Sequence, residues 1–303
     1  MENKKVIIIG AGPSGITASI YLYRAGYEPY LIEKSMPGGK LSLTYKIDNY
    51  PGFSSIMGSD LAFKMMDQLS SNNIEVHYED VLEVKKQDDK VYVKTDANEY
   101  LADAVLIASG TSEKTLGIPG EEKFMHKGIS FCAVCDGGFY KGKNTAIIGG
   151  GNSALEEALY LHNLSSKLYL IHRRNEFRGE KVVLDEIKKI ENIEIKTPYI
   201  PVEFKGDSAL KSIVLENVET KEREEIEVEG AFEYVGAIAN TSFVLDKEIL
   251  DDKGYIVVNS KMETKVKGIY AAGDVIVKDL RQIVTASSDG AIAAINLSAY
   301  LKK

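Results

Sequence analysis

Apolar residues occur in short unbroken runs in this chain, and the first run lies close to its start. Residues 6–9 are Val-Ile-Ile-Ile, which predicts a parallel strand covered on both faces. A glycine-rich turn follows at 10–15, and a helical stretch then covers 16–25. A second apolar segment, 30–32, ends on Glu33. This order predicts a strand–turn–helix–strand unit of about 30 residues.

The same pattern occurs again near the middle of the chain. The apolar run 145–148 leads into a second glycine turn at 149–154, then into a helical stretch and the apolar run 168–171. In the dinucleotide-binding fingerprint the first glycine permits a tight turn, the second lets a pyrophosphate approach, and the third lets helix and strand pack closely. Ala154 takes the third place in the second copy, which the fingerprint allows. We therefore predict an α/β protein with two Rossmann-like dinucleotide-binding domains.

The two copies differ at the position that reads the ribose. Glu33 follows Gly10 by the same 23 residues that separate His172 from Gly149. A carboxylate accepts hydrogen bonds from a free 2′-hydroxyl, whereas arginines pair with a 2′-phosphate. The first copy therefore favours FAD or NAD, and the second favours NADP. The alternative for the second copy is a solvated charge run at a strand end. Its basic cluster comprises His172, Arg173, Arg174 and Arg178.

Cys132 and Cys135 are the only cysteines, and they stand just before the second glycine turn. A zinc site needs about four ligands, and the histidines show no ligand spacing. A structural disulfide across so short a loop would constrain little of the unfolded chain. A redox-active pair is the favoured interpretation, with two inert thiols as the alternative. Asp136 is then a candidate proton donor, although Asp-Gly-Gly is also a turn sequence in its own right.

The order of these motifs has a mechanical consequence. The cysteines and the second dinucleotide site belong to the same segment of the chain, and both must reach one flavin. They are not expected to reach it simultaneously. The sequence thus predicts a domain movement between two half-reactions.

Composition narrows the possible partners and the location. The chain has 303 residues and a net charge of -8, which argues against nucleic acid as a partner, although mild acidity also serves solubility. No apolar run approaches the ~20 residues of a membrane span. The start enters a strand at once, so no signal peptide is expected, and two cysteines are too few for a disulfide framework. We expect a cytoplasmic protein.

Taken together, these residues resemble low-molecular-weight thioredoxin reductases, and the resemblance covers essentially the whole chain. It lies in the cysteine segment 132–137, the second glycine turn with its helix 149–158, and the basic cluster. It extends to the segments 48–52, 268–274, 281–282 and 289–291. The resemblance implies a three-layer ββα architecture in which an NADPH-binding domain, residues 114–242, is inserted into an FAD-binding domain, residues 1–113 and 243–303. It also implies a homodimer.

The resemblance further implies an activity and its residues. NADPH reduces FAD, FAD reduces the Cys132–Cys135 disulfide, and the dithiol reduces thioredoxin or a thioredoxin-like protein. By similarity Cys135 faces the flavin, Cys132 attacks the thioredoxin disulfide and Asp136 is the acid. The expected FAD-binding residues are Gly10, Gly12, Pro13, Ser14, Gly15, Glu33, Lys40, Leu41, Asn49, Gly273, Asp274, Arg281, Gln282 and Ile283. The expected NADPH-binding residues are Gly151, Asn152, Ser153, His172, Arg173, Arg174 and Arg178. No metal is expected.

Several positions depart from the family pattern. Lys40, Leu280 and Ser288 stand where the family usually has Gln, an aromatic residue and Gly, and they bear on the potential and solvent access of the flavin. Ala239 replaces a usual Pro. Two alternative functions remain: a ferredoxin-fed flavoprotein thioredoxin reductase, and a flavin redox sensor without turnover. The second glycine turn and its arginines argue against the first alternative, because those enzymes lack the pyridine-nucleotide motifs.

Overall fold

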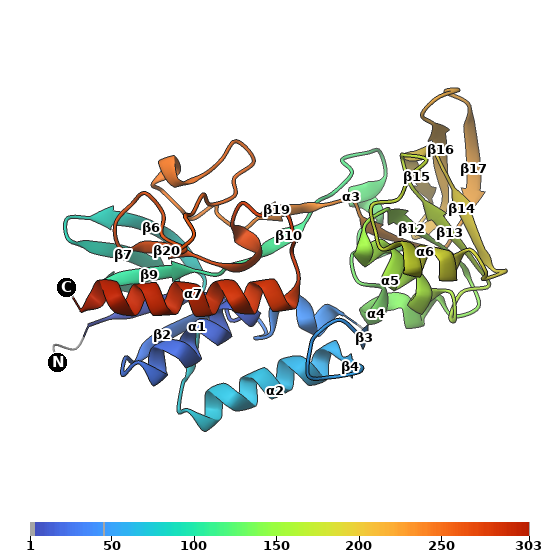
Figure 1. Ribbon diagram of the computed structural model, residues 1–303. Helices are drawn as coiled ribbons and strands as arrows, with labels where there is room; N and C mark the ends of the chain where they lie inside the picture. The colour runs from blue at the N-terminus through green and yellow to red at the C-terminus, as the bar shows by residue number, and fades with distance from the viewer. Residues whose placement is uncertain (1–3, 45, 303) are drawn as a thin grey trace. The chain divides into compact units, whose positions relative to one another are not determined.

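The computed structural model describes residues 4–44 and 46–302, apart from the side chains of residues 43, 46 and 135. The chain forms two compact units (Figure 1). Unit 1 combines Met1–Ser112 with Ile238–Lys303, and unit 2 is Glu113–Ala237. Among the described residues, none of the helices combines the length and apolarity needed to cross a bilayer.

Unit 1 is built on a five-stranded parallel sheet. Its strand order is β20-β9-β1-β2-β5, and every described pairing within it is parallel. All side chains of the central strands β1 and β9 are buried, as the unbroken apolar run predicted for β1. The strands are β1 (Val6–Ile9), β2 (Pro29–Glu33), β5 (Val76–Tyr78), β9 (Ala104–Ile107) and β20 (Ile269–Ala271).

Helices cover one face of this sheet, and a three-stranded antiparallel sheet covers the other (Figure 1). α7 lies along α1 so closely that a Cβ on Gly290 would fall 2.2 Å from the carbonyl oxygen of Ser14. One hydrophobic core joins all three layers. The elements are α1 (Pro13–Arg24), α2 (Gly58–Ser71), α7 (Ile283–Leu301), β6 (Val81–Gln87), β7 (Lys90–Thr95) and β8 (Glu99–Ala102).

Unit 2 repeats this plan with other residues. Its parallel sheet has the order β11-β18-β12-β13-β14; one apolar core packs helices on one face and another packs an antiparallel sheet on the other. The parallel strands are β11 (Ile129–Ser130), β12 (Asn144–Gly149), β13 (Lys167–Ile171), β14 (Ile193–Lys196) and β18 (Gly230–Tyr234). The covering elements are α5 (Asn152–Leu161), α6 (Lys181–Ile187), β15 (Tyr199–Gly206), β16 (Leu210–Asn217) and β17 (Arg223–Glu227).

Short elements complete the two units. In unit 1 they are η1 (Gly39–Leu43), β3 (Lys46–Ile47), β4 (Ile56–Met57), η3 (Lys247–Ile249) and η4 (Gly273–Val275). In unit 2 they are α3 (Glu121–Phe124), α4 (Ala133–Asp136) and η2 (Gly137–Tyr140). The two segments that connect the units, β10 (Thr111–Glu113) and β19 (Ala237–Ala239), pair as a two-stranded sheet.

The second boundary between the units differs from the sequence expectation. The sequence placed it between 242 and 243, whereas the compact units divide between Ala237 and Ile238. Residues after β19 are tied to unit 1 by hydrogen bonds: Asn240 Nδ2 donates to the Ser109 carbonyl at 3.0 Å, and Thr241 Oγ1 donates to the Gly254 carbonyl at 2.7 Å. These tertiary bonds have no local signature in the sequence.

Candidate functional site

The first glycine turn has the geometry that a bound pyrophosphate requires. Gly10 has φ +103°, a conformation that favours glycine. A Cβ on Gly15 would lie 1.9 Å from the Gly10 carbonyl oxygen, so the helix meets the strand closely. A Cβ on Gly12 would meet nothing within 4 Å, so this glycine faces open space. Glu33 holds the turn by accepting the Ala11 N–H at 2.8 Å.

Buried polar atoms without partners mark the same region. Ser14 Oγ, Asp274 Oδ1 and Ser287 Oγ are buried and lack a hydrogen-bond partner among the described residues. A Cβ on Gly273 would lie 2.8 Å from Ser14 Cβ, so η4 lies against the start of α1. Buried polar groups are almost always hydrogen-bonded in folded proteins. These groups therefore fit a polar ligand with hydroxyl and phosphate groups, such as the sugar–pyrophosphate part of a dinucleotide.

Asp274 is held in a mixed electrostatic environment. Burial raises the pKa of its carboxyl, while the positive charges of Lys278, Lys40 and Arg281 act in the opposite direction. The Arg281 guanidinium donates to the carbonyl oxygens of Asp274, Ile276 and Lys278 at 3.1–3.2 Å. This side chain, expected to contact the flavin, therefore shapes the loop that presents Asp274.

The remaining expected FAD-binding residues lie around this loop and the first turn. Asn49 Nδ2 donates to Gln282 Oε1 at 3.1 Å, which brings segments far apart in sequence together. Leu41 is buried in a small apolar cluster against which Ile283 packs. Pro13 occupies the first turn of α1. The structure thus gathers these residues within unit 1.

The second glycine turn offers open space at the corresponding place. A Cβ on Gly151 would meet nothing within 4 Å, and this residue precedes α5 as its N-cap, followed by Asn152 and Ser153. A Cβ on Gly150 would fall 2.4 Å from the His172 ring. His172 is only 5% exposed, and burial lowers its pKa. The imidazole ring therefore packs directly against Gly150 of the turn.

The loop after His172, which contains the arginines, folds back to this turn. The backbone N–H groups of Arg178 and Gly179 both donate to the Gly150 carbonyl oxygen, at 2.7 and 3.1 Å. Arg173, Arg174 and Arg178 are all exposed. The loop therefore places exposed positive charge beside a turn that is open to a phosphate-bearing ligand, an arrangement that suits charge-assisted bonds to a 2′-phosphate.

Cys132 is disulfide-bonded and 9% exposed. The sequence contains one other cysteine, Cys135, whose side chain lies outside the described residues. Asp136 accepts a hydrogen bond from Ser130 Oγ at 2.7 Å, and the same hydroxyl oxygen accepts the Cys132 N–H at 3.1 Å. A single serine thus joins the expected acid, Asp136, to the backbone of Cys132.

Two residues of this arrangement were missed by the sequence reasoning. Ser130 stands two positions before Cys132, but serine so close to a cysteine carries no signal by itself. The Tyr234 hydroxyl accepts the Ala133 N–H at 3.0 Å, although it lies 101 residues further along the chain. The parallel pairing of β18 with β11 brings it here, because the cysteine turn directly follows β11.

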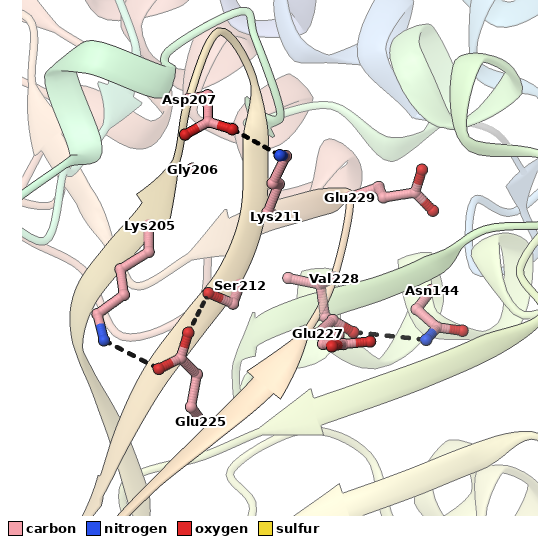
Figure 2. Close-up of a pocket in the computed structure, with 10 residues that line it drawn as sticks. All are labelled: Asn144, Lys205, Gly206, Asp207, Lys211, Ser212, Glu225, Glu227, Val228 and Glu229. Atoms are coloured by element: carbon pink, nitrogen blue, oxygen red, sulfur yellow. Dashed lines mark hydrogen bonds and ion pairs between the residues drawn. The ribbon is translucent and has the colours of Figure 1, made fainter.

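The described pocket lies elsewhere in unit 2. This cavity of about 540 Å³ is formed by the antiparallel sheet and the start of β12 (Figure 2). Its charged side chains largely form ion pairs with one another. Lys205 Nζ lies 2.9 Å from Glu225 Oε2, and Lys211 Nζ lies 2.6 Å from Asp207 Oδ2. None of the expected site residues lines it.

Comparison with known proteins decides the family. A family model described as pyridine nucleotide-disulphide oxidoreductase matches residues 4–290. The chain belongs to this family. The sequence is 40% identical over 299 residues to a thioredoxin reductase of Bacillus subtilis (strain 168), covering 98% of this chain and 95% of that protein. The resemblance to thioredoxin reductases is confirmed.

Solved structures extend the comparison within the family. The thioredoxin reductase of Lactococcus lactis has a TM-score of 0.97 at 39% identity, covering 99% of both chains. That of T. acidophilum has a TM-score of 0.94 at 35% identity, covering 100% of both chains. A ferredoxin-flavin thioredoxin reductase of Clostridium acetobutylicum has a TM-score of 0.55 at 28% identity, covering 100% of this chain and 98% of that one. The predicted α/β fold with two Rossmann-like cores is confirmed.

Proposed function

We propose that this pyridine nucleotide-disulphide oxidoreductase is an NADPH-dependent thioredoxin-disulfide reductase that uses FAD. The observation that supports it most strongly is the content of unit 2. This unit holds the disulfide-bonded Cys132 together with an open glycine turn beside exposed arginines. Relatives that match nearly the whole chain include the thioredoxin reductases of Bacillus subtilis and Lactococcus lactis.

FAD fits unit 1. Gly12 would let the pyrophosphate approach the backbone, Ser14 and Asp274 would bond groups of the ligand that their buried atoms now lack, and Glu33 would accept a ribose hydroxyl. Bound FAD would supply two-electron exchange between a nicotinamide and a disulfide. These assignments, and the division into an FAD-binding domain and an inserted NADPH-binding domain, are part of the proposal.

NADPH fits unit 2. Gly151 and the N-terminus of α5 would receive its pyrophosphate, and Arg173, Arg174 and Arg178 would bond the 2′-phosphate. Asn152 and Ser153 belong to the same helix start. His172 would act indirectly, because its ring packs against Gly150 and holds it in place.

The thiol chemistry rests on Cys132 and Cys135. Two electrons open their disulfide and leave two sulfur anions, of which one takes up a proton. In this proposal Asp136, which accepts a hydrogen bond from Ser130, gives that proton. The Cys132 thiolate then attacks the thioredoxin disulfide and forms a mixed disulfide. The Cys135 thiol passes its proton to the thioredoxin sulfur freed in that attack, and the resulting Cys135 thiolate attacks Cys132 Sγ. Thioredoxin leaves as a thiolate that takes a second proton from solvent, and the original disulfide is restored. A cytoplasmic homodimer completes the proposal.

Anaerobic titration of the purified protein tests this assignment against its alternatives. NADPH should bleach the bound flavin at stoichiometric addition, and NADH should need a far higher concentration. Cys132→Ser and Cys135→Ser should each retain this bleaching and lose thioredoxin reduction. Bleaching by neither nucleotide would favour the ferredoxin-fed enzyme. Bleaching by NADPH without turnover on any thioredoxin would favour a redox sensor.

A further inference from the structure

Tyr234 occupies a special place in unit 2. It is the last residue of β18 and pairs with Gly149, the first glycine of the second turn. In unit 1 the strand β9 also runs beside the first glycine, but the residue there is Ala108. The aromatic side chain at the end of β18 is therefore an addition to the common plan of the two units. Its function has to be sought in what its hydroxyl contacts.

The Tyr234 hydroxyl binds the turn between the two cysteines. Ala133 directly follows Cys132, and its N–H donates to the phenol oxygen at 3.0 Å. Ala133 is 0% exposed, so water has no ready access to this amide. A buried N–H that loses its partner costs about 1–3 kcal/mol. The phenol thus matters to the conformation in which this amide is buried.

The phenol remains neutral while it accepts this hydrogen bond. Burial raises its pKa well above the ordinary value, and the negative charges of Glu157, Glu113 and Asp136 add to this shift. The hydrogen bond from the Ala133 N–H acts in the opposite direction, more weakly than burial. A neutral phenol is a constant acceptor across the working pH range. Its contribution is consequently one of position rather than of proton transfer.

We propose that Tyr234 is a positioning residue that stabilises the disulfide form of the cysteine pair over the dithiol form. The inference rests on the proposed function, in which this pair is oxidised and reduced in every cycle. The bonded geometry belongs to the state in which Cys132 is disulfide-bonded. With Cys135 as the partner, as the proposed function has it, this bond closes residues 132–135 into a small ring. Reduction breaks that ring, which removes one of the constraints on the Ala133 peptide. A contact made better in one state shifts the equilibrium toward that state.

The test measures the redox equilibrium of the full-length flavoprotein. Wild type and Tyr234→Phe are equilibrated anaerobically with mixtures of reduced and oxidised dithiothreitol, quenched with acid, and alkylated for intact mass. The substitution should shift the equilibrium toward the dithiol about tenfold, which is about 30 mV for a two-electron couple. Tyr199→Phe is the matched control, because it removes a phenol hydroxyl from β15 of the same unit. This control should stay within about twofold of wild type.

Thermal unfolding of the oxidised and reduced forms separates positioning from general stability. Tyr234→Phe should lower the melting temperature of the oxidised form more than that of the reduced form. Equal losses in both forms, with an unchanged dithiothreitol equilibrium, would overturn the inference, as would a shift toward the disulfide. A wild-type disulfide that dithiothreitol cannot reduce would contradict the proposed function itself, and no variant is needed to see it.

Discussion

The two parallel sheets of this molecule follow one plan and differ in what surrounds each glycine turn. In unit 1 the turn follows β1, between β9 and β2; in unit 2 it follows β12, between β18 and β13. The residue before each turn pairs with a strand in the same register, Ile9 with Ile107 and Ile148 with Glu233. In the proposed function both units bind a dinucleotide through this shared scaffold, so the choice of dinucleotide has to come from the positions that differ.

The first such position is the end of the second strand of each unit, where the ribose of a bound dinucleotide is expected. In unit 1 Glu33 is anchored to the turn through the Ala11 N–H. In unit 2 the ring of His172 lies under Gly150, and the following loop presents exposed arginines. Unit 1 therefore presents a fixed carboxylate at this position and unit 2 an exposed basic cluster, although both units follow the same strand–turn–helix order.

The third position of each turn yields the largest expected effect. Gly15→Ala would place a Cβ 1.9 Å from the Gly10 carbonyl oxygen, and neither backbone can move without separating α1 from the sheet. We expect a loss of about 3 kcal/mol in the free energy of unfolding of unit 1, with weakened FAD retention. Urea unfolding monitored by flavin release measures both.

The second turn supplies the matched control. Ala154 already occupies the third position there and is fully buried. Ala154→Gly should therefore cost less, about 2 kcal/mol, through helix propensity and a lost methyl group. Equal losses in the two variants would mean that the helices approach their turns in the same way and would remove this difference between the units.

The basic cluster gives the next largest effect. Arg173→Ala combined with Arg174→Ala should weaken NADPH binding about 100-fold and NADH binding less than about threefold, because only NADPH has the 2′-phosphate. Flavin bleaching as a function of nucleotide concentration measures both. Lys188→Ala combined with Lys189→Ala removes two exposed charges near the end of α6 and should change neither. Equal losses for both nucleotides in the arginine variant would refute 2′-phosphate recognition.

Sequence reasoning succeeded where the information is local. The two glycine turns, their strands and helices, and the adjacency of Asp136 to the cysteines are all properties of short segments. It missed Ser130 and Tyr234, because their contacts with the cysteine turn depend on tertiary structure. The hydrogen bonds of Arg281 to three carbonyls were hidden for the same reason.

Glu233 is a difference between the parallel sheets of the two units that sequence reasoning did not predict. Its counterpart Ile107 lies in an entirely apolar strand, whereas Glu233 is fully buried beside the Glu121 carboxyl. Burial, followed by the Glu121 carboxyl, raises the pKa of Glu233 to about 9. Glu121 itself accepts the backbone N–H groups of Leu116 and Ile118, so one carboxylate of the pair has a structural use. Two adjacent buried carboxyls cannot both ionise at low cost.

This pair predicts a pH dependence of stability. Below about pH 4.5 Glu233 is protonated whether folded or unfolded; between about 4.5 and 9 only the folded state keeps the proton, so stability falls as pH rises through this window. Glu233→Gln keeps the shape and removes this linkage. Relative to wild type, the variant should gain stability steadily as the pH rises from 5 to 9 in urea unfolding. Asp185→Asn, which neutralises an exposed acid in the same unit, should leave the slope unchanged. Parallel pH profiles for wild type and Glu233→Gln would show that Glu233 is ionised in the folded protein. They would also remove this electrostatic difference between β9 and β18.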